Sequence, residues 1–480
     1  MFKIIPNSLN TDDLISEHSP RAIFNFRKEN LVYIIDLIYS IPANNKKLIT
    51  EDGFVSINAS FLQKKIRNYY QYLKYLLKAG VLICDNQYKK GVKCKGYKFA
   101  PEYSGETKLT ELNGKIGIAK LSRQGSISFK VKKQYSYLLK WYNPNLQIDH
   151  TAARKYLQLE VDYKIKSKVR WDYDPLKKAY KHPLQQFYCS QVNINKIVSH
   201  EFNVNIDDKV GRLHSPLSNM KSELRNFLAY EGQSLVSIDV KSSQPCLSTL
   251  LFHSSFWDYN GVYDSVNIDP ISVKTINMHK CFNSVTDCSS LDSFIMLCKS
   301  HQSDLQSDVY RFKNLMEDGS FYEYMENNIS KELGIEYTNR TDIKAAMFQV
   351  LFTDNRFLGQ KEAGPKRVFK QLFPIVYEMF RKVKQSDKTL LPIMLQRIES
   401  YLLLKVIAKR IAKEKQHLPI FTIHDSVITT IGNQQYVKEV VEQEMIKAIG
   451  FAPKLSIDLW RPENLMLPTI GNLSQTHHAA

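Results

Sequence analysis

The sequence predicts a mixed fold of the α/β or α+β class, in which helices and a sheet pack as layers. Three observations predict it. The 480 residues are 43% hydrophobic, which is enough to bury a sizeable core. The second half alternates short apolar runs with stretches of helical periodicity. The first half contains amphipathic helical segments and a hairpin pattern, so strands and helices are interleaved along the chain.

The charge balance favours a polyanionic partner. The chain has 66 Lys and Arg against 48 Asp and Glu, a formal net charge of +18, and cations gain affinity for nucleic acid by neutralising phosphates. Charge alone also fits a ribosome-associated or membrane-surface protein. The start MFKIIPNSLNTDD is not a basic region followed by an apolar run, and no run of eighteen apolar residues occurs. We therefore expect a cytoplasmic protein without membrane contact.

Residues 1–105 are expected to form an N-terminal domain. The segment INASFLQKKIRNYYQYLKYLLKAGVL has apolar residues at helical spacing and a stop at Gly80, and LICDNQYKKGVKCKGYKF predicts two strands around a Lys- and Gly-rich tip. The pattern resembles a winged helix. Cations suited to phosphate contacts lie on the helix and the tip: Lys64, Lys65, Arg67, Lys89, Lys90, Lys93 and Lys95. The alternative is a solvated basic face on a packing module.

Residues 106–200 interleave Tyr, Lys and Arg with short apolar runs and are expected to be a helical connector. Aromatic rings beside cations could stack bases and hold phosphates, although most of these tyrosines are better explained by packing in or near the core. Beyond residue 200 the pattern predicts a strand at 235–240, helices at about 340–352 and 393–414, a strand ending in a turn at Asp425, a returning strand at 426–431, a helix at 434–449 and a last strand at 454–460.

Two carboxylates end apolar strands: Asp239 in SLVSIDVKSSQP and Asp425 in IFTIHDSVITT. A carboxylate in such a position is costly unless it is paired, hydrogen-bonded or bound to a cation. If the two strands are neighbours, the carboxylates can share two magnesium ions that promote an in-line phosphoryl displacement. Taken singly, each aspartate is more often a strand-end cap or an ion-pair partner than a metal ligand.

A second pattern lies between them, in NRTDIKAAMFQVLF. Arg340, Lys344, Phe348 and Phe352 recur every four residues and share one face of a helix. Two cations and two rings could hold a triphosphate and stack a base. The alternative is a basic edge beside an apolar core stripe.

Together these segments resemble the polymerase domain of family A DNA polymerases, the DNA polymerase I type, and more distantly the single-subunit phage-type RNA polymerases. Asp239 with Ser243 and Gln244 resembles the first motif of that family, the helix 340–352 the second, and His424 with Asp425 the third. VGRLHSPLSNM and LQRIESYLLLKVI resemble two flanking segments. The resemblance covers about residues 200–465.

The resemblance implies an α+β right-hand fold, with palm and fingers at 201–480, fingers at about 320–385 and a thumb at 106–200. It implies that two Mg²⁺ ions, for which Mn²⁺ can substitute, bind Asp239, Asp425 and the Val240 carbonyl. The remaining implied roles are phosphate binding by Arg340 and Lys344, protonation of pyrophosphate by Lys344, nucleotide contacts by Gln244, Phe348 and Phe352, and primer–template contacts by Arg212, Gln396 and His424.

The expected function is a template-dependent DNA polymerase that extends a primer 3′ end. Pro245 and Cys246 follow the Ser–Gln pair where the family has a glutamate that screens the sugar, so the choice between dNTPs and NTPs stays open. No paired acidic motif of an exonuclease appears, so we expect no proofreading. The alternatives are a primase or single-subunit RNA polymerase, and a catalytically inactive DNA-binding replication protein. Expected partners are DNA primer–template, nucleoside triphosphates and an accessory subunit or replicative helicase, in a mobile-element context.

Overall fold

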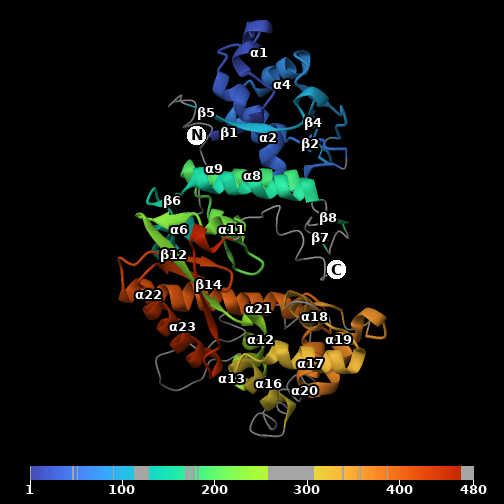
Figure 1. Ribbon diagram of the computed structural model, residues 1–480, viewed down its shortest axis with the longest axis vertical. Helices are drawn as coiled ribbons and strands as arrows, with labels where there is room; N and C mark the ends of the chain where they lie inside the picture. Colours follow the sequence, from blue (N-terminus) through green and yellow to red (C-terminus); the bar gives the residue numbers. More distant parts are fainter. Residues whose placement is uncertain are drawn as a thin grey trace.

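The computed structural model describes residues 2–112, 129–167, 183–257 and 307–465, with short gaps at 46–47, 51, 90, 338–339, 355, 357 and 386, together with 173–174 and 179–180. Residues 258–306 lie outside these ranges. The described chain is elongated, with an N-terminal unit at one end, a sheet near the middle and a helical layer at the other end (Figure 1). The mixed content of helices and strands confirms the predicted α+β class.

The central sheet has six antiparallel strands. Its order is β13 (Ile420–Ile423), β14 (Ser426–Thr430), β12 (Gln233–Val240), β11 (Leu228–Tyr230) and β6 (Leu146–Ile148), and β15 (Leu455–Leu459) also pairs with β12. The strands predicted around Asp239 and Asp425 are therefore confirmed. The strand β6 lies in the segment expected to be helical. It was not predicted, because three residues are too few to show an alternating pattern.

Helices form the layer beyond the sheet. They include α12 (Ser243–Ser248), α13 (Ser254–Trp257), α16 (Asp308–Glu317), α17 (Phe321–Leu333), α18 (Arg340–Phe352), α19 (Gly364–Leu372), α20 (Pro374–Val383) and α23 (Gln434–Ile449). The predicted helix at 393–414 is a continuous one, made of α21 (Leu390–Ser400), a π-helical segment (Tyr401–Ile407) and α22 (Ala408–Glu414). Buried aromatic rings pack between α16, α17, α19 and α20. The ring centroids of Phe312 and Phe373, for example, are 5.6 Å apart.

The N-terminal unit contains β1 (Phe2–Pro6), α1 (Thr11–Glu17), α2 (Lys28–Asn44), β2 (Val55–Ser56), α3 (Ala59–Lys65), α4 (Tyr69–Lys78), β3 (Leu82–Cys84), β4 (Gly96–Phe99) and β5 (Thr107–Glu111). The predicted hairpin is present, since β3 and β4 pair from Leu82 opposite Phe99. Gly80 has a φ of +73°, so it ends α4 as predicted. β5 pairs with β1 across the boundary expected at residue 105.

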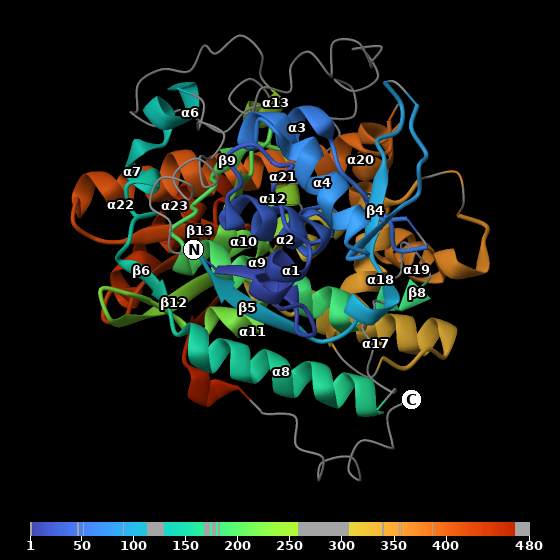
Figure 2. The ribbon, with the colours of Figure 1, turned by 90° about the horizontal axis from the view of Figure 1, so that it is seen from above.

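Shorter elements and two long helices connect this unit to the sheet. The short elements are α6 (Phe129–Gln134), α7 (Ser136–Leu139), β7 (Tyr173–Asp174), β8 (Ala179–Tyr180), β9 (Asn205–Ile206), β10 (Leu213–His214), α10 (Pro216–Asn219) and α11 (Ser222–Arg225). The long helices are α8 (His150–Ser167) and α9 (Pro183–Val198), and α8 runs along one side of the molecule seen from above (Figure 2). Among the described residues, no helix combines the length and the apolar character needed to cross a bilayer.

Candidate active site

The register of the sheet brings Asp239 and Asp425 to the same end of adjacent strands. Asp239, the penultimate residue of β12, lies opposite Ser426, the first residue of β14. Asp425 directly precedes Ser426. The Val240 amide donates a hydrogen bond to the Asp425 carbonyl (3.3 Å), and the Ser426 hydroxyl donates to Asp239 Oδ1 (2.5 Å). Two carboxylates that are distant in sequence are thus held together by backbone pairing.

The backbone is unusual on both sides of this pair. His424 and Asp425 are the two residues between Ile423 and Ser426, which pair as the ends of β13 and β14. His424 has a φ of +50°, and Ser242, just after β12, has a φ of +55°. This left-handed region is uncommon for residues other than glycine, and strained residues of this kind cluster at functional sites.

The electrostatics of the pair favour a bound cation. Desolvation raises the pKa of Asp425 above its ordinary value, and the nearby Asp239 and Glu399 carboxylates raise it further, while Arg212 opposes them. A divalent cation would relieve this repulsion. Within the described residues no group of three or more His, Cys, Asp or Glu side chains is placed to hold a metal. Two carboxylates fit Mg²⁺, which usually binds one or two protein carboxylates and completes its shell with water and substrate phosphates.

Glu399 is a site residue that the sequence analysis missed. It lies on α21, its side chain is 3% exposed, and it forms an ion pair with Arg212. The Ser243 hydroxyl donates to Glu399 Oε1 (2.9 Å). The sequence contained a signal for its burial. Glu399 is four residues after Leu395 and three before Leu402, so it lies on the same apolar face of the helix as these two residues.

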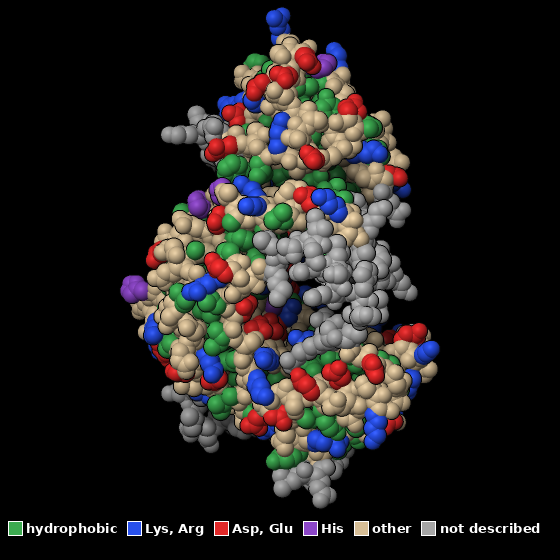
Figure 3. All heavy atoms as spheres, viewed as in Figure 1, with side chains coloured by type: hydrophobic (Ala, Val, Ile, Leu, Met, Phe, Trp, Pro, Cys, Tyr) green, Lys and Arg blue, Asp and Glu red, His purple; other side chains and the backbone are tan. Residues whose placement is uncertain are grey.

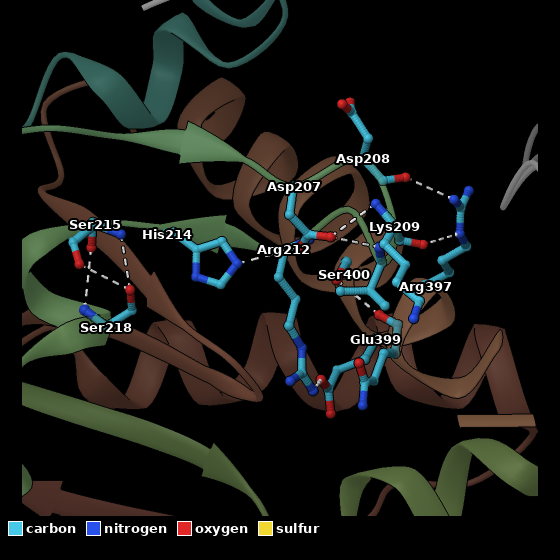
Figure 4. Close-up of polar contacts among 12 residues, drawn as sticks. Asp207, Asp208, Lys209, Arg212, His214, Ser215, Ser218, Arg397, Glu399 and Ser400 are labelled. Carbon is cyan, nitrogen blue, oxygen red and sulfur yellow. Dashed lines mark hydrogen bonds and ion pairs between the residues drawn. The ribbon is translucent and has the colours of Figure 1, made fainter. Parts of the chain in front are cut away.

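Arg212 is held by a loop that is fixed onto α21 (Figure 4). The Asp207 carboxylate accepts hydrogen bonds from the backbone amides of Lys209 (2.9 Å), Val210 (2.8 Å) and Arg212 (3.0 Å). Arg397 on α21 donates to the Lys209 carbonyl (2.7 Å). Because both ends of the loop are constrained, Arg212 is positioned before any ligand binds.

Other predicted residues lie around the same centre. Gln396 is half-buried on α21, three residues before Glu399. The buried Oε1 of Gln244 and the Nε of Arg212 lack a hydrogen-bond partner in the described part of the chain. Burial lowers the pKa of His424, and Arg212, Arg225 and His214 lower it further, so this imidazole is neutral at pH 7.

The predicted nucleotide-binding residues lie on α18, which packs against α21. Lys344 is exposed, with Nζ 6.0 Å from the Tyr322 ring centroid. Phe348 is 43% exposed, and its ring centroid is 5.1 Å from that of Phe352. Arg340 begins the helix, and its side chain lies outside the described part. No contact between these side chains and the aspartates is described. The face drawn in Figure 3 is hollowed between the sheet and the helical layer, with acidic and basic side chains at the hollow.

Two buried lysines cap the C-terminal end of α18. Lys384 Nζ donates to the carbonyls of Val350 (2.7 Å) and Thr353 (3.2 Å), and Lys366 Nζ donates to the Asp354 carbonyl (2.9 Å). Desolvation and the neighbouring Lys366 lower the pKa of Lys384 to about 7. These lysines satisfy carbonyl groups that the end of a helix leaves without partners.

Comparisons with known proteins found little similarity in sequence. No protein-family model matches the chain, and no curated protein matches it. Among solved structures, the chain is similar to the POL domain of Pol1 from M. smegmatis in complex with DNA primer-template and dNTP, with 12% identity, 72% of each chain covered and a TM-score of 0.27. The functional assignment therefore rests on the residues of this chain.

Proposed function

We propose that this protein is a template-dependent DNA polymerase that adds nucleotides to a primer 3′ end, without proofreading. The observation that supports it most is the sheet register, which brings Asp239 at the end of β12 next to Asp425, the residue directly before the adjacent antiparallel strand β14. The ion pair between Arg212 and the buried Glu399 lies beside them. Two carboxylates and a cation at one end of a sheet suit the binding of metal ions, phosphates and a nucleic acid backbone.

In this proposal Asp239, Asp425 and the Val240 carbonyl hold two Mg²⁺ ions. When bound, such ions lower the pKa of the attacking primer hydroxyl and stabilise the leaving oxygen. The Ser426 hydroxyl orients the Asp239 carboxylate through its hydrogen bond. Asp425 is fixed from its main chain, because its carbonyl accepts from the Val240 amide. The two carboxylates therefore need little rearrangement to act as ligands.

Residues of α18 and α12 bind the incoming nucleotide. Arg340 and Lys344 hold its phosphates, and Lys344 donates a proton to the leaving pyrophosphate. Phe348 and Phe352 pack against the base and sugar, for which the exposed ring of Phe348 is available. Gln244 offers its Oε1, which has no hydrogen-bond partner among the described residues, as an acceptor for a nucleotide donor group.

Primer and template are positioned by Arg212, Gln396 and His424. Glu399 orients the Arg212 guanidinium by a charge-assisted contact, leaving the Nε without a partner in the described chain. A neutral His424 can accept or donate a hydrogen bond to a sugar or base without adding charge.

The test is extension on a single-stranded DNA template with magnesium, with and without a primer, offering dNTPs and NTPs separately. We expect extension only from the primer and with dNTPs, and no removal of a mismatched primer 3′ nucleotide. Primer-free products or ready use of NTPs would indicate a primase instead. Absence of incorporation in every combination would contradict the proposal.

A further inference from the structure

The segment 59–98 has an extreme charge asymmetry. It contains ten Lys and Arg residues and a single acidic residue, Asp85. The fold uses Asp85 internally, because its carboxylate accepts from the backbone amides of Gly96 (2.9 Å) and Gln87 (3.0 Å) and pairs with Lys93 (3.6 Å). For Arg67, Lys74 and Lys78 the described chain provides no ion pair. The positive charge of this segment is therefore not balanced from within the segment.

These cations lie on two consecutive helices with a short connection. α3 ends at Lys65 and α4 begins at Tyr69, so three residues join them, the spacing of a helix-turn-helix. α4 buries Tyr72, Leu73 and Leu76 in the N-terminal core. Its opposite face presents Tyr70, Lys74 and Lys78 at four-residue spacing, and Tyr70 is 64% exposed.

The hairpin between β3 and β4 exposes large side chains at its tip. Tyr88 is 64% exposed and Val92 is 76% exposed, beside the exposed Lys89 and Lys95. These side chains do not stabilise the core. Exposed apolar groups surrounded by cations mark an interaction surface for a negatively charged partner.

We propose that the exposed face of α4 and the tip of the β3–β4 hairpin bind double-stranded DNA, with α4 in the major groove and the hairpin on the backbone. The major groove is wide enough for an α-helix, and the second helix of a helix-turn-helix enters it. Lys74 and Lys78 contact phosphates, and Gln71, exposed beside Tyr70, faces the bases. Proteins that bind single-stranded DNA usually hold it in a basic groove. The exposed lysines and tyrosines of this segment instead lie on the outer face of one helix and at a hairpin tip, which favours duplex DNA.

This binding goes beyond the proposed polymerase activity, because it needs no primer terminus. It is tested with the full-length chain and a fluorescent DNA duplex whose two ends are closed by non-nucleotide linkers. We expect the protein to bind this duplex, and the Lys74→Ala/Lys78→Ala variant to bind it at least about tenfold more weakly. The slope of log affinity against log salt concentration should fall by about 2 in that variant, roughly one per lost phosphate contact.

The matched control is Lys409→Ala/Lys413→Ala, which removes two exposed lysines at the same spacing from α22. We expect it to bind the closed duplex like the wild type. The α4 variant should keep its thermal unfolding midpoint and still extend a short primer–template, since it leaves the aspartates untouched. An unchanged affinity and salt slope in the α4 variant would overturn the proposal, and so would displacement of the closed duplex by single-stranded DNA at lower concentrations than by duplex DNA.

Discussion

At the scale of single residues, the neighbouring carboxylates Asp239 and Asp425 dominate the electrostatics of the candidate site. Burial raises the pKa of Asp425, and repulsion from the Asp239 and Glu399 carboxylates raises it further. Both aspartates could be predicted from the sequence, because a charged residue that ends an apolar strand needs an explanation. Glu399 was not predicted, because a glutamate within a helical segment is ordinarily expected at the surface.

Replacing Asp425 by Asn should separate stability from activity. With EDTA, the variant should be more stable than the wild type by roughly 1 kcal/mol at pH 7, because it removes a buried charge from a repulsive cluster. A carboxyl with a raised pKa stabilises the fold below its unfolded pKa, and this stability is lost as pH rises through the folded pKa. As pH rises from the unfolded pKa to the folded pKa of Asp425, the wild type should therefore lose stability relative to Asp425→Asn. Thermal unfolding across pH would measure the difference.

The same variant should not incorporate nucleotides, and Mg²⁺ should raise its melting temperature less than that of the wild type. Asp458→Asn, which removes an exposed carboxylate of β15, is the control and should behave like the wild type. Nucleotide incorporation by Asp425→Asn at the wild-type rate would refute the assigned role.

Replacing Glu399 by Gln should weaken primer–template binding. The change keeps the shape of the side chain but removes the charge that orients Arg212, so we expect the KM for primer–template to rise several-fold with a smaller effect on kcat. Loss of this buried ion pair should also cost about 1–3 kcal/mol of stability. Steady-state extension and urea unfolding would measure these effects.

Glu414→Gln is the matched control for Glu399→Gln, because Glu414 pairs with Arg410 in a more exposed position. It should leave the KM unchanged. If Glu399→Gln lowers stability without altering the KM for primer–template, Glu399 has only a structural role.

At the scale of elements, α18 depends on residues that are distant in sequence. Its bounds were predicted from periodicity alone and agree with the structure. Its capping could not be predicted, because lysines are normally exposed and nothing local indicates that Lys384 reaches the Val350 carbonyl in its last turn, or that Lys366 reaches the Asp354 carbonyl just beyond it. The C-terminal end of the helix that carries Lys344, Phe348 and Phe352 is thus held in place by two buried lysines.

Lys384→Met should become more destabilising as pH rises. A lysine with a pKa of about 7 in the fold is deprotonated above pH 7, whereas the unfolded chain stays protonated up to its ordinary pKa of 10.5. Stability of the wild type therefore rises with pH between these values. Between pH 6 and pH 9 the destabilisation by Lys384→Met should grow by roughly 3 kcal/mol, since about two pH units lie above the folded pKa and each contributes about 1.36 kcal/mol.

Urea unfolding at both pH values would measure this difference. Lys382→Met, which replaces a less buried lysine of α20, is the control and should show no comparable trend. A constant difference between wild type and Lys384→Met at pH 6 and pH 9 would show that Lys384 stays charged in the fold.

At the scale of the whole molecule, α9 links the N-terminal unit to the sheet. Val192 belongs to the N-terminal core, whereas Ile194 and Ile197 belong to the core beneath the sheet. The helical character of this segment was predicted, but its double attachment was not, because periodicity identifies a buried face without its partner. The pairing of β5 with β1 inside the N-terminal unit, and of β6 with β11 inside the sheet, likewise could not be read from a single sequence.

Because α9 belongs to both cores, a destabilising substitution on the side that packs beneath the sheet should also destabilise the N-terminal unit. Ile194→Ala removes a fully buried side chain and should cost about 2–4 kcal/mol. We expect hydrogen exchange to accelerate in β6 and β11 and also in α2, which packs on α9. Leu76→Ala, a fully buried change inside the N-terminal core, should accelerate exchange in α2 and α4 while β6 and β11 stay protected. If Ile194→Ala leaves exchange in α2 unchanged, the two cores unfold independently, and α9 connects them without coupling their stabilities.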